Sequence, residues 1–128
     1  MIYLAVIDLP VGLWAVFAPE SFYKNFPGLG RHWVSTQGPF NHHLITDTGA
    51  GFLAVTAALL LAAVWMSKPA VVVALVASLA HDLPHFIFHL THPNHALSGA
   101  DQLLSTGGLG LGCVVAAVLI TWVRSWPS

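Results

Sequence analysis

Charged residues are scarce in this sequence. Only 7% of its 128 residues are Asp, Glu, Lys or Arg, whereas 56% are hydrophobic and the mean hydropathy is +0.76. Because a water-soluble domain carries about 25% charged residues, the chain cannot cover its surface with polar groups as such a domain does. Four Lys and Arg against five Asp and Glu give a net charge of −1, which excludes the basic surface that nucleic-acid binding requires.

Cysteine is almost absent as well. The single cysteine, Cys113, lies in an apolar, glycine-rich run. One cysteine builds neither a disulfide framework nor a cysteine-based metal motif, so both are excluded. The chain also has no internal repeat and no low-complexity segment, and we expect one domain, residues 1–128.

Long hydrophobic runs make up most of the chain. A helix needs about 20 mostly apolar residues to cross the hydrocarbon layer, since each residue adds about 1.5 Å. Four segments meet this requirement, at residues 1–18, 42–66, 70–91 and 100–123. The sequence therefore predicts an all-α, integral membrane four-helix bundle in the cell membrane.

The first of these segments contains Asp8 and Pro10. It has neither the basic start nor the A-x-A site of a cleaved signal peptide, so we expect it to be retained as a span. Orientation follows from the few cations, because Lys and Arg prefer the cytoplasmic side. Lys68, Arg124 and the N-terminal amine outnumber the cations of the first loop, and both termini are therefore expected in the cytoplasm.

The connection at residues 19–41 combines aromatic residues with prolines and glycines. Its aromatic residues are Phe22, Tyr23, Phe26, Trp33 and Phe40. Such a segment is neither a span nor a soluble domain. We expect it to lie in the headgroup layer or to fold over the helix ends as a lid.

Ionisable residues gather at one end of the predicted bundle. If the helices alternate in direction, the start of the second, the end of the third and the start of the fourth meet at one membrane face. These segments hold His42, His43, Asp47, His81, Asp82, His85, His89, His92, His95 and Asp101. The other halves, residues 56–66, 69–80 and 112–122, carry no ionisable residue apart from Cys113.

Four of these histidines share one face of the third helix. His81, His85, His89 and His92 follow at steps of four, four and three residues, which is the spacing of one helical face. Pro84 lies within this stripe and is expected to kink the helix.

Burial in a membrane requires these side chains to have partners. An ionisable group at the bilayer centre costs about 2.5–3.5 kcal/mol, and a metal ion would satisfy several histidines at once. Imidazole and carboxylate ligands fit zinc, copper(II) or iron. We predict a metal site at the outer end of the bundle, made by His43, Asp47, His85 and His89 and extended by His81 and Asp101. Asp101 has an alternative role, because "SGAD" at residues 98–101 is typical of a helix N-terminus.

Two other functions fit the same residues. A b-type haem would take His43 with His85 or His89 as its axial pair. Alternatively, the chain is a non-catalytic accessory subunit without metal, whose polar stripe contacts other membrane subunits. Gly108 and Gly112 have a spacing that favours close helix packing, within this chain or in a homo-oligomer. The leading hypothesis is a metal-binding membrane protein that serves as a redox or accessory subunit, and whether the chain is itself an enzyme stays open.

Two resemblances bear on this hypothesis. The run "PESFYKNFPGLGRHWVSTQGPFNHHLITDTGAGFLAV", residues 19–55, resembles small uncharacterised four-helix membrane proteins of actinobacteria, which are akin to the DoxX-like group. This resemblance implies the four-helix fold and no particular activity. The "HFIFH" motif at residues 85–89 is similar to a histidine box of membrane di-iron hydroxylases and desaturases, but their later box is absent.

Overall fold

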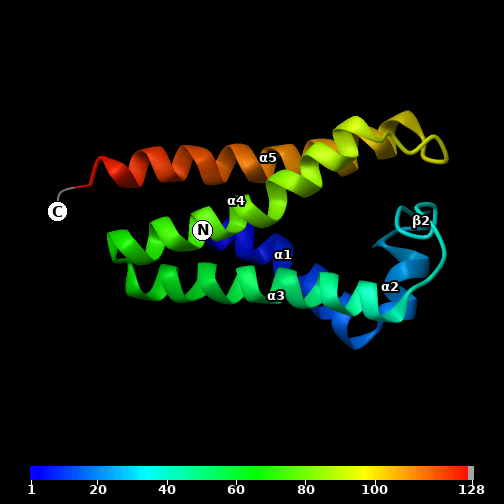
Figure 1. Ribbon diagram of the computed structural model, residues 1–128, viewed down its shortest axis with the longest axis horizontal. Helices are drawn as coiled ribbons and strands as arrows, with labels where there is room; N and C mark the ends of the chain where they lie inside the picture. Colours follow the sequence, from blue (N-terminus) through cyan, green and yellow to red (C-terminus); the bar gives the residue numbers. More distant parts are fainter. Residues whose placement is uncertain (127–128) are drawn as a thin grey trace.

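The computed structural model describes residues 1–126 and is mostly helical (Figure 1). Four long helices run along the long axis of the molecule, and a short helix and a small hairpin cover one end of them. The elements are α1 (Ile2–Phe17), α2 (Pro19–Asn25), β1 (Pro27–Gly28), β2 (Arg31–His32), α3 (His42–Trp65), α4 (Lys68–Thr91) and α5 (Gly99–Arg124). The four long helices begin and end within two residues of the predicted spans.

Three of the helices could cross a membrane by length and composition. These are α3, α4 and α5, with mean hydropathies of 1.9, 1.7 and 2.2 in their most apolar windows. Helix α1 has only 16 residues. It meets the same criterion only together with α2, from which it is bent by 120°. The predicted helical fold is thus confirmed, with three helices long and apolar enough to cross a membrane, and α1 meets that criterion only as part of a bent pair.

The helix ends follow local sequence signals. The side chain of Asn41 accepts a hydrogen bond from the backbone N–H of Leu44 at 3.0 Å and starts α3. Ser98 does the same for Asp101 at 3.1 Å and starts α5, so the predicted cap is confirmed. Met66 has a left-handed backbone with φ 47° and ends α3, and α4 begins two residues later.

Helices α1 and α3 approach each other most closely at two glycines. A Cβ added to Gly49 would lie 2.8 Å from the Cβ of Ala15 and 2.9 Å from the backbone nitrogen of Val16. A Cβ added to Gly12 would lie 2.9 Å from Leu53. Only glycine allows the two backbones this distance. Helix α3 then packs against α4, and α4 against α5.

One end of the bundle, which we call the closed end, is filled by a hydrophobic core. Leu59 of α3, Leu75 of α4 and Ala116 of α5 are fully buried there, and Leu4 of α1 is 3% exposed. The Nζ of Lys68 donates to the carbonyl oxygens of Arg124 and Trp126 at 3.2 and 2.9 Å. Side chains from all four long helices thus meet, and the start of α4 is tied to the end of α5.

At the other end the helices separate. Helix α4 contains Pro84 and changes direction along its length, so that its second half follows α5 away from α1 and α3 (Figure 1). Proline produces such a kink because it has no N–H to donate and its ring displaces the preceding turn. The predicted kink is therefore confirmed.

Residues 19–41, which we call the lid, fold over this separated end. They comprise α2, the antiparallel hairpin that pairs Pro27 with His32, and a segment of turns and bends that leads into α3. Of the two predicted placements, the fold over the helix ends is the one that the structure has. We refer to this part of the molecule as the lid end.

Candidate functional site

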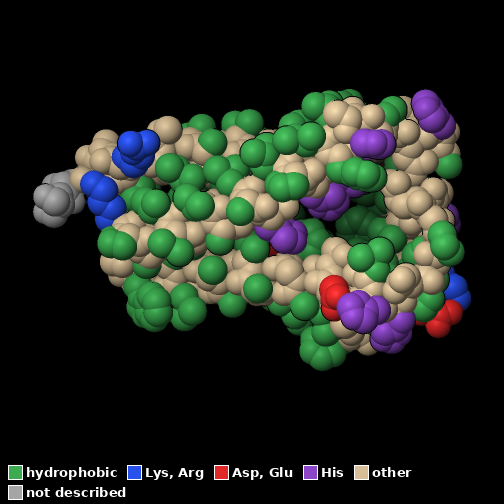
Figure 2. Space-filling view, in the orientation of Figure 1, with side chains coloured by type: hydrophobic (Ala, Val, Ile, Leu, Met, Phe, Trp, Pro, Cys, Tyr) green, Lys and Arg blue, Asp and Glu red, His purple; other side chains and the backbone are tan. Residues whose placement is uncertain are grey.

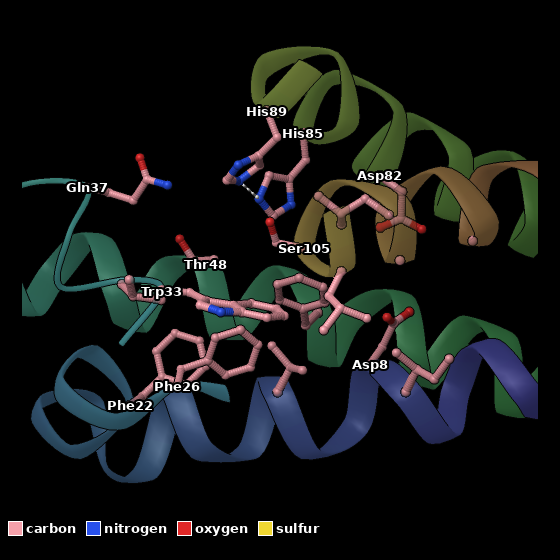
Figure 3. A pocket seen from close by; sticks show the side chains of 18 of the residues that line it. Asp8, Phe22, Phe26, Trp33, Gln37, Thr48, Asp82, His85, His89 and Ser105 are labelled. Atoms are coloured by element: carbon pink, nitrogen blue, oxygen red, sulfur yellow. Dashed lines mark hydrogen bonds between the residues drawn. The ribbon is translucent and has the colours of Figure 1, made fainter. Parts of the chain in front are cut away.

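A cavity of about 480 Å³ lies at the lid end, between the α1–α3 pair and the α4–α5 pair (Figure 3). Its walls are mostly aliphatic and aromatic, with a few polar side chains from four helices and the lid. Ligand pockets in proteins typically measure about 300–1,000 Å³ and combine an apolar wall with a few placed polar groups. The cavity has both properties.

Aromatic rings of the lid form the roof of the cavity. Phe22 and Phe26 lie with ring centroids 4.7 Å apart, and Trp33 lies edge-on to Phe26 at 5.9 Å. All three line the cavity, and Figure 3 shows them together on one side of it. Phe22 is buried and the other two rings are half-buried, and aromatic rings supply a large apolar contact area.

Polar contacts hold the roof on the rest of the molecule. The indole N–H of Trp33 donates to Oδ1 of Asp101 at 2.9 Å, and the guanidinium of Arg31 lies 3.1 Å from the same oxygen. Farther along the lid, the amide of Asn94 donates to Thr36 at 2.7 Å. Asp101 therefore has a role that the sequence did not predict, because it joins the lid to the start of α5.

Two carboxylates form the end of the cavity nearest the core. Asp8 of α1 is 8% exposed and Asp82 of α4 is 6% exposed, and both line the cavity (Figure 3). Both carboxylate oxygens of Asp82 have a hydrogen-bond partner. Ser78 donates to Oδ2 at 3.1 Å, and the Nδ1 of His81 lies 3.0 Å from Oδ1. By contrast, Oδ2 of Asp8 is buried and has no hydrogen-bond partner among residues 1–126.

His85 and His89 face the cavity from the kinked half of α4 (Figure 3). Their Nε2 atoms are 3.1 Å apart and their ring centroids 4.9 Å apart. At this distance one ring donates a hydrogen bond to the other. At least one of the two Nε2 atoms therefore carries a hydrogen when no ligand is bound. The predicted one-turn spacing thus places two imidazoles in direct contact.

The predicted gathering of ionisable residues at one end is confirmed, as Figure 2 shows for the histidines. The predicted metal ligands do not form a single cluster, however. His43 and Asp47 pair with each other at 2.8 Å, with side chains 85% and 64% exposed. Asp101 pairs with the lid and His81 with Asp82. Within residues 1–126, no three His, Cys, Asp or Glu side chains are arranged to hold a metal ion.

Part of the predicted set meets at a second, more open hollow between α3 and α4. Asp47, His81 and His85 line it together with Gly51 and Phe52. A Cβ added to Gly51 would lie 3.1 Å from Nε2 of His81, so glycine leaves room for that ring against α3. The ring of Phe52 lies edge-on to His81, with centroids 4.6 Å apart. The polar residues of this hollow are His81 and His85 of α4 and Asp47 and Thr48 of α3.

Sequence reasoning missed several residues of the cavity. The sequence leaves Asp8 open between a bond to backbone or a neighbouring helix and a role in the site, although a lone carboxylate in an apolar helix is a signal for a site. Gly108 and Gly112 were read as a helix-packing motif. Both line the cavity, and a Cβ added to either would have no atom within 4 Å. Within the described chain they therefore line the cavity and do not bring two helices together, and packing between copies of the chain stays a prediction.

No family model, curated protein or solved structure matches the chain. The resemblance to DoxX-like proteins therefore stays a prediction, and the functional argument depends on the geometry of the cavity.

Proposed function

We propose that the chain is an integral membrane protein that crosses the membrane four times, with the α1–α2 pair as the bent first span. Three membrane-length helices support this proposal, as do large apolar side chains exposed on every long helix, such as Ile2, Val64, Val73 and Leu103. Lipid can cover such surfaces without the free-energy cost of exposing apolar side chains to water. Lys68 and Arg124 lie at the closed end, which we assign to the cytoplasm because cations prefer that side.

We propose further that the protein binds a small, mostly apolar molecule in the cavity under the lid. One observation carries this proposal: about 480 Å³ of mostly apolar space contains four ionisable side chains, from Asp8, Asp82, His85 and His89. The side chains around an empty apolar cavity lose van der Waals contacts, which costs stability. A bound apolar molecule would restore these contacts. A Cβ added to Gly108 or Gly112 would meet no atom within 4 Å, so the space beside these glycines is unfilled.

Leucine at the cavity glycines tests this proposal. Gly108 and Gly112 line the cavity, and a Cβ added to either would meet no atom within 4 Å, so leucine at either position should place its side chain at the cavity wall; Gly107 is exposed and does not line the cavity. Naphthylethanol is a suitable probe, and isothermal titration calorimetry in one detergent measures its affinity. We expect saturable binding to the wild-type protein and to Gly107→Leu, and at least about tenfold weaker binding to the two cavity variants. Equal affinity in all four proteins would refute the proposal.

A metal ion bound by His85 and His89 is a second candidate. Zinc–nitrogen bonds are about 2.0–2.1 Å long. Two nitrogens 3.1 Å apart therefore fit one ion with an N–metal–N angle of about 100°. The remaining ligands would come from solvent or from the bound molecule, as in sites that keep open positions. Elemental analysis of detergent-purified protein tests this candidate, since metal near one ion per chain supports it and trace amounts contradict it.

Haem has less support from the geometry. Its predicted axial pair needs His43 opposite His85 or His89, whereas the His43 side chain is 85% exposed and contacts Asp47. Axial ligands of one haem iron approach from opposite faces of the ring, and His85 and His89 lie one turn apart on the same helix. The Soret band in the absorption spectrum of the purified protein decides this point.

A further inference from the structure

The most informative polar atom in the cavity is Oδ2 of Asp8. Asp8 is more than nine-tenths buried, lines the cavity, and has no protein partner for this oxygen among residues 1–126. Figure 3 shows its carboxyl group directed into the cavity from α1, across from Asp82 on α4. The great majority of buried polar atoms in proteins are hydrogen-bonded, so this oxygen is a site where a bound molecule can supply the partner that the described residues do not.

Asp8 faces a second carboxylate, and no permanently charged cation, Lys or Arg, of the described chain lines the cavity with it. Asp82, the second carboxylate at this end, already receives hydrogen bonds from Ser78 and His81, so it cannot donate to Asp8 while it is ionised. An anionic ligand group would face two carboxylates, which is unfavourable in a medium of low dielectric constant.

We propose that the molecule bound in the cavity is an apolar amine, whose ammonium group donates to Oδ2 of Asp8. Its apolar body would extend toward the roof formed by Phe22, Phe26 and Trp33. An ammonium carries three N–H donors and a positive charge, so it satisfies the free oxygen and offsets the two carboxylates together. A hydroxyl supplies one donor and no charge. This inference depends on the proposed function and names the ligand class for the same cavity.

Three probes with one ring system test the ligand class. Naphthylethylamine, naphthylethanol and naphthaleneacetate share the apolar body and end in a cation, a neutral hydroxyl and an anion. For the wild-type protein we expect the amine to bind at least about tenfold more tightly than the alcohol, because an added charge-assisted hydrogen bond strengthens binding by about 1.5–3 kcal/mol. The anion should bind more weakly than the alcohol. An alcohol that binds as tightly as the amine would overturn the inference.

Asp8→Asn removes the charge and keeps the shape. We expect it to lose the preference for the amine, so that the amine and the alcohol bind the variant with similar affinity. Asp47→Asn is the matched control, because the Asp47 side chain is 64% exposed and does not line this cavity, and it should keep the full preference. A preference that survives in Asp8→Asn would refute the role of Asp8. If Asp8→Asn differs from the wild-type protein in size-exclusion chromatography, Asp8→Ser replaces it, and we expect the same result from that variant.

The two proposals fail in different ways. If no probe binds the wild-type protein, or if Gly108→Leu binds the alcohol unchanged, the cavity is not a binding site and the proposed function is wrong. If Gly108→Leu blocks the alcohol while the amine shows no advantage in the wild-type protein, the cavity binds a ligand of another class and only the present inference is wrong.

Discussion

Replacing Gly49 by alanine should destabilise the protein, although alanine is the better helix former. Gly49 lies where α3 contacts α1, and an added Cβ would be 2.8 Å from the Cβ of Ala15 and 2.9 Å from the backbone nitrogen of Val16. A side chain could rotate away, but the backbone of α1 cannot. We therefore expect Gly49→Ala to move α1 away from α3 and loosen the bundle.

Two opposing contributions set the size of this effect. Alanine gains up to about 1 kcal/mol over glycine within a helix. Overpacking of a well-filled contact costs about 1–3 kcal/mol, and contacts below 3.0 Å to backbone place Gly49 toward the upper part of that range. The free energy of unfolding should therefore fall by about 1–2 kcal/mol.

Gly107→Ala is the matched control, because Gly107 is also helical and a Cβ added there meets no atom within 4 Å. Alanine at this position should leave stability unchanged or raise it by up to about 1 kcal/mol. Unfolding in a detergent titration, followed by circular dichroism, measures both variants against the wild-type protein. If Gly49→Ala is as stable as Gly107→Ala, the close approach of α1 and α3 is wrong, and with it the wall of the cavity.

Two further predictions concern the lid and the histidine pair. Asp101→Ala removes the acceptor that Trp33 and Arg31 share. Hydrogen–deuterium exchange of the backbone amides at residues 31–37, measured by mass spectrometry, should therefore accelerate by about fivefold or more, while exchange in α3 stays unchanged. Unchanged exchange in residues 31–37 would show that this contact does not hold the lid. If metal binds, His85→Ala should reduce it to trace levels, whereas His92→Ala should not, because His92 is exposed and stacks on Phe88; equal metal content in both variants would contradict ligation by His85.

Much of the fold could be predicted from the sequence. Hydrophobic length located the four long helices, the Ser98 to Asp101 pattern located the start of α5, and Pro84 located the kink in α4. These features depend on local physics, namely the length of an apolar run, the capping of free N–H groups and the missing donor of proline. Local signals of this kind survive in any tertiary arrangement.

The site was harder to predict because it depends on how the helices rotate about their axes. The sequence placed His43 and Asp47 at the correct end but could not show that they point outward and pair with each other. It could not show that α4 and α5 separate from α1 and α3 at the lid end. Because of this separation, Gly108 and Gly112 line a cavity. Helical spacing within α4 correctly predicted the contact of His85 with His89, because residues four apart lie on one helix face. It could not show that His81, at the same spacing from His85, pairs with Asp82 instead.

The central claim is that the space under the lid binds a small apolar molecule, and one calorimetric comparison tests it most directly. Naphthylethanol is titrated into the wild-type protein and into Gly108→Leu in the same detergent. The structure predicts saturable heat for the wild-type protein and at least about tenfold weaker binding for the variant, whose added side chain should lie at the cavity wall. Indistinguishable titrations of the two proteins would contradict the claim.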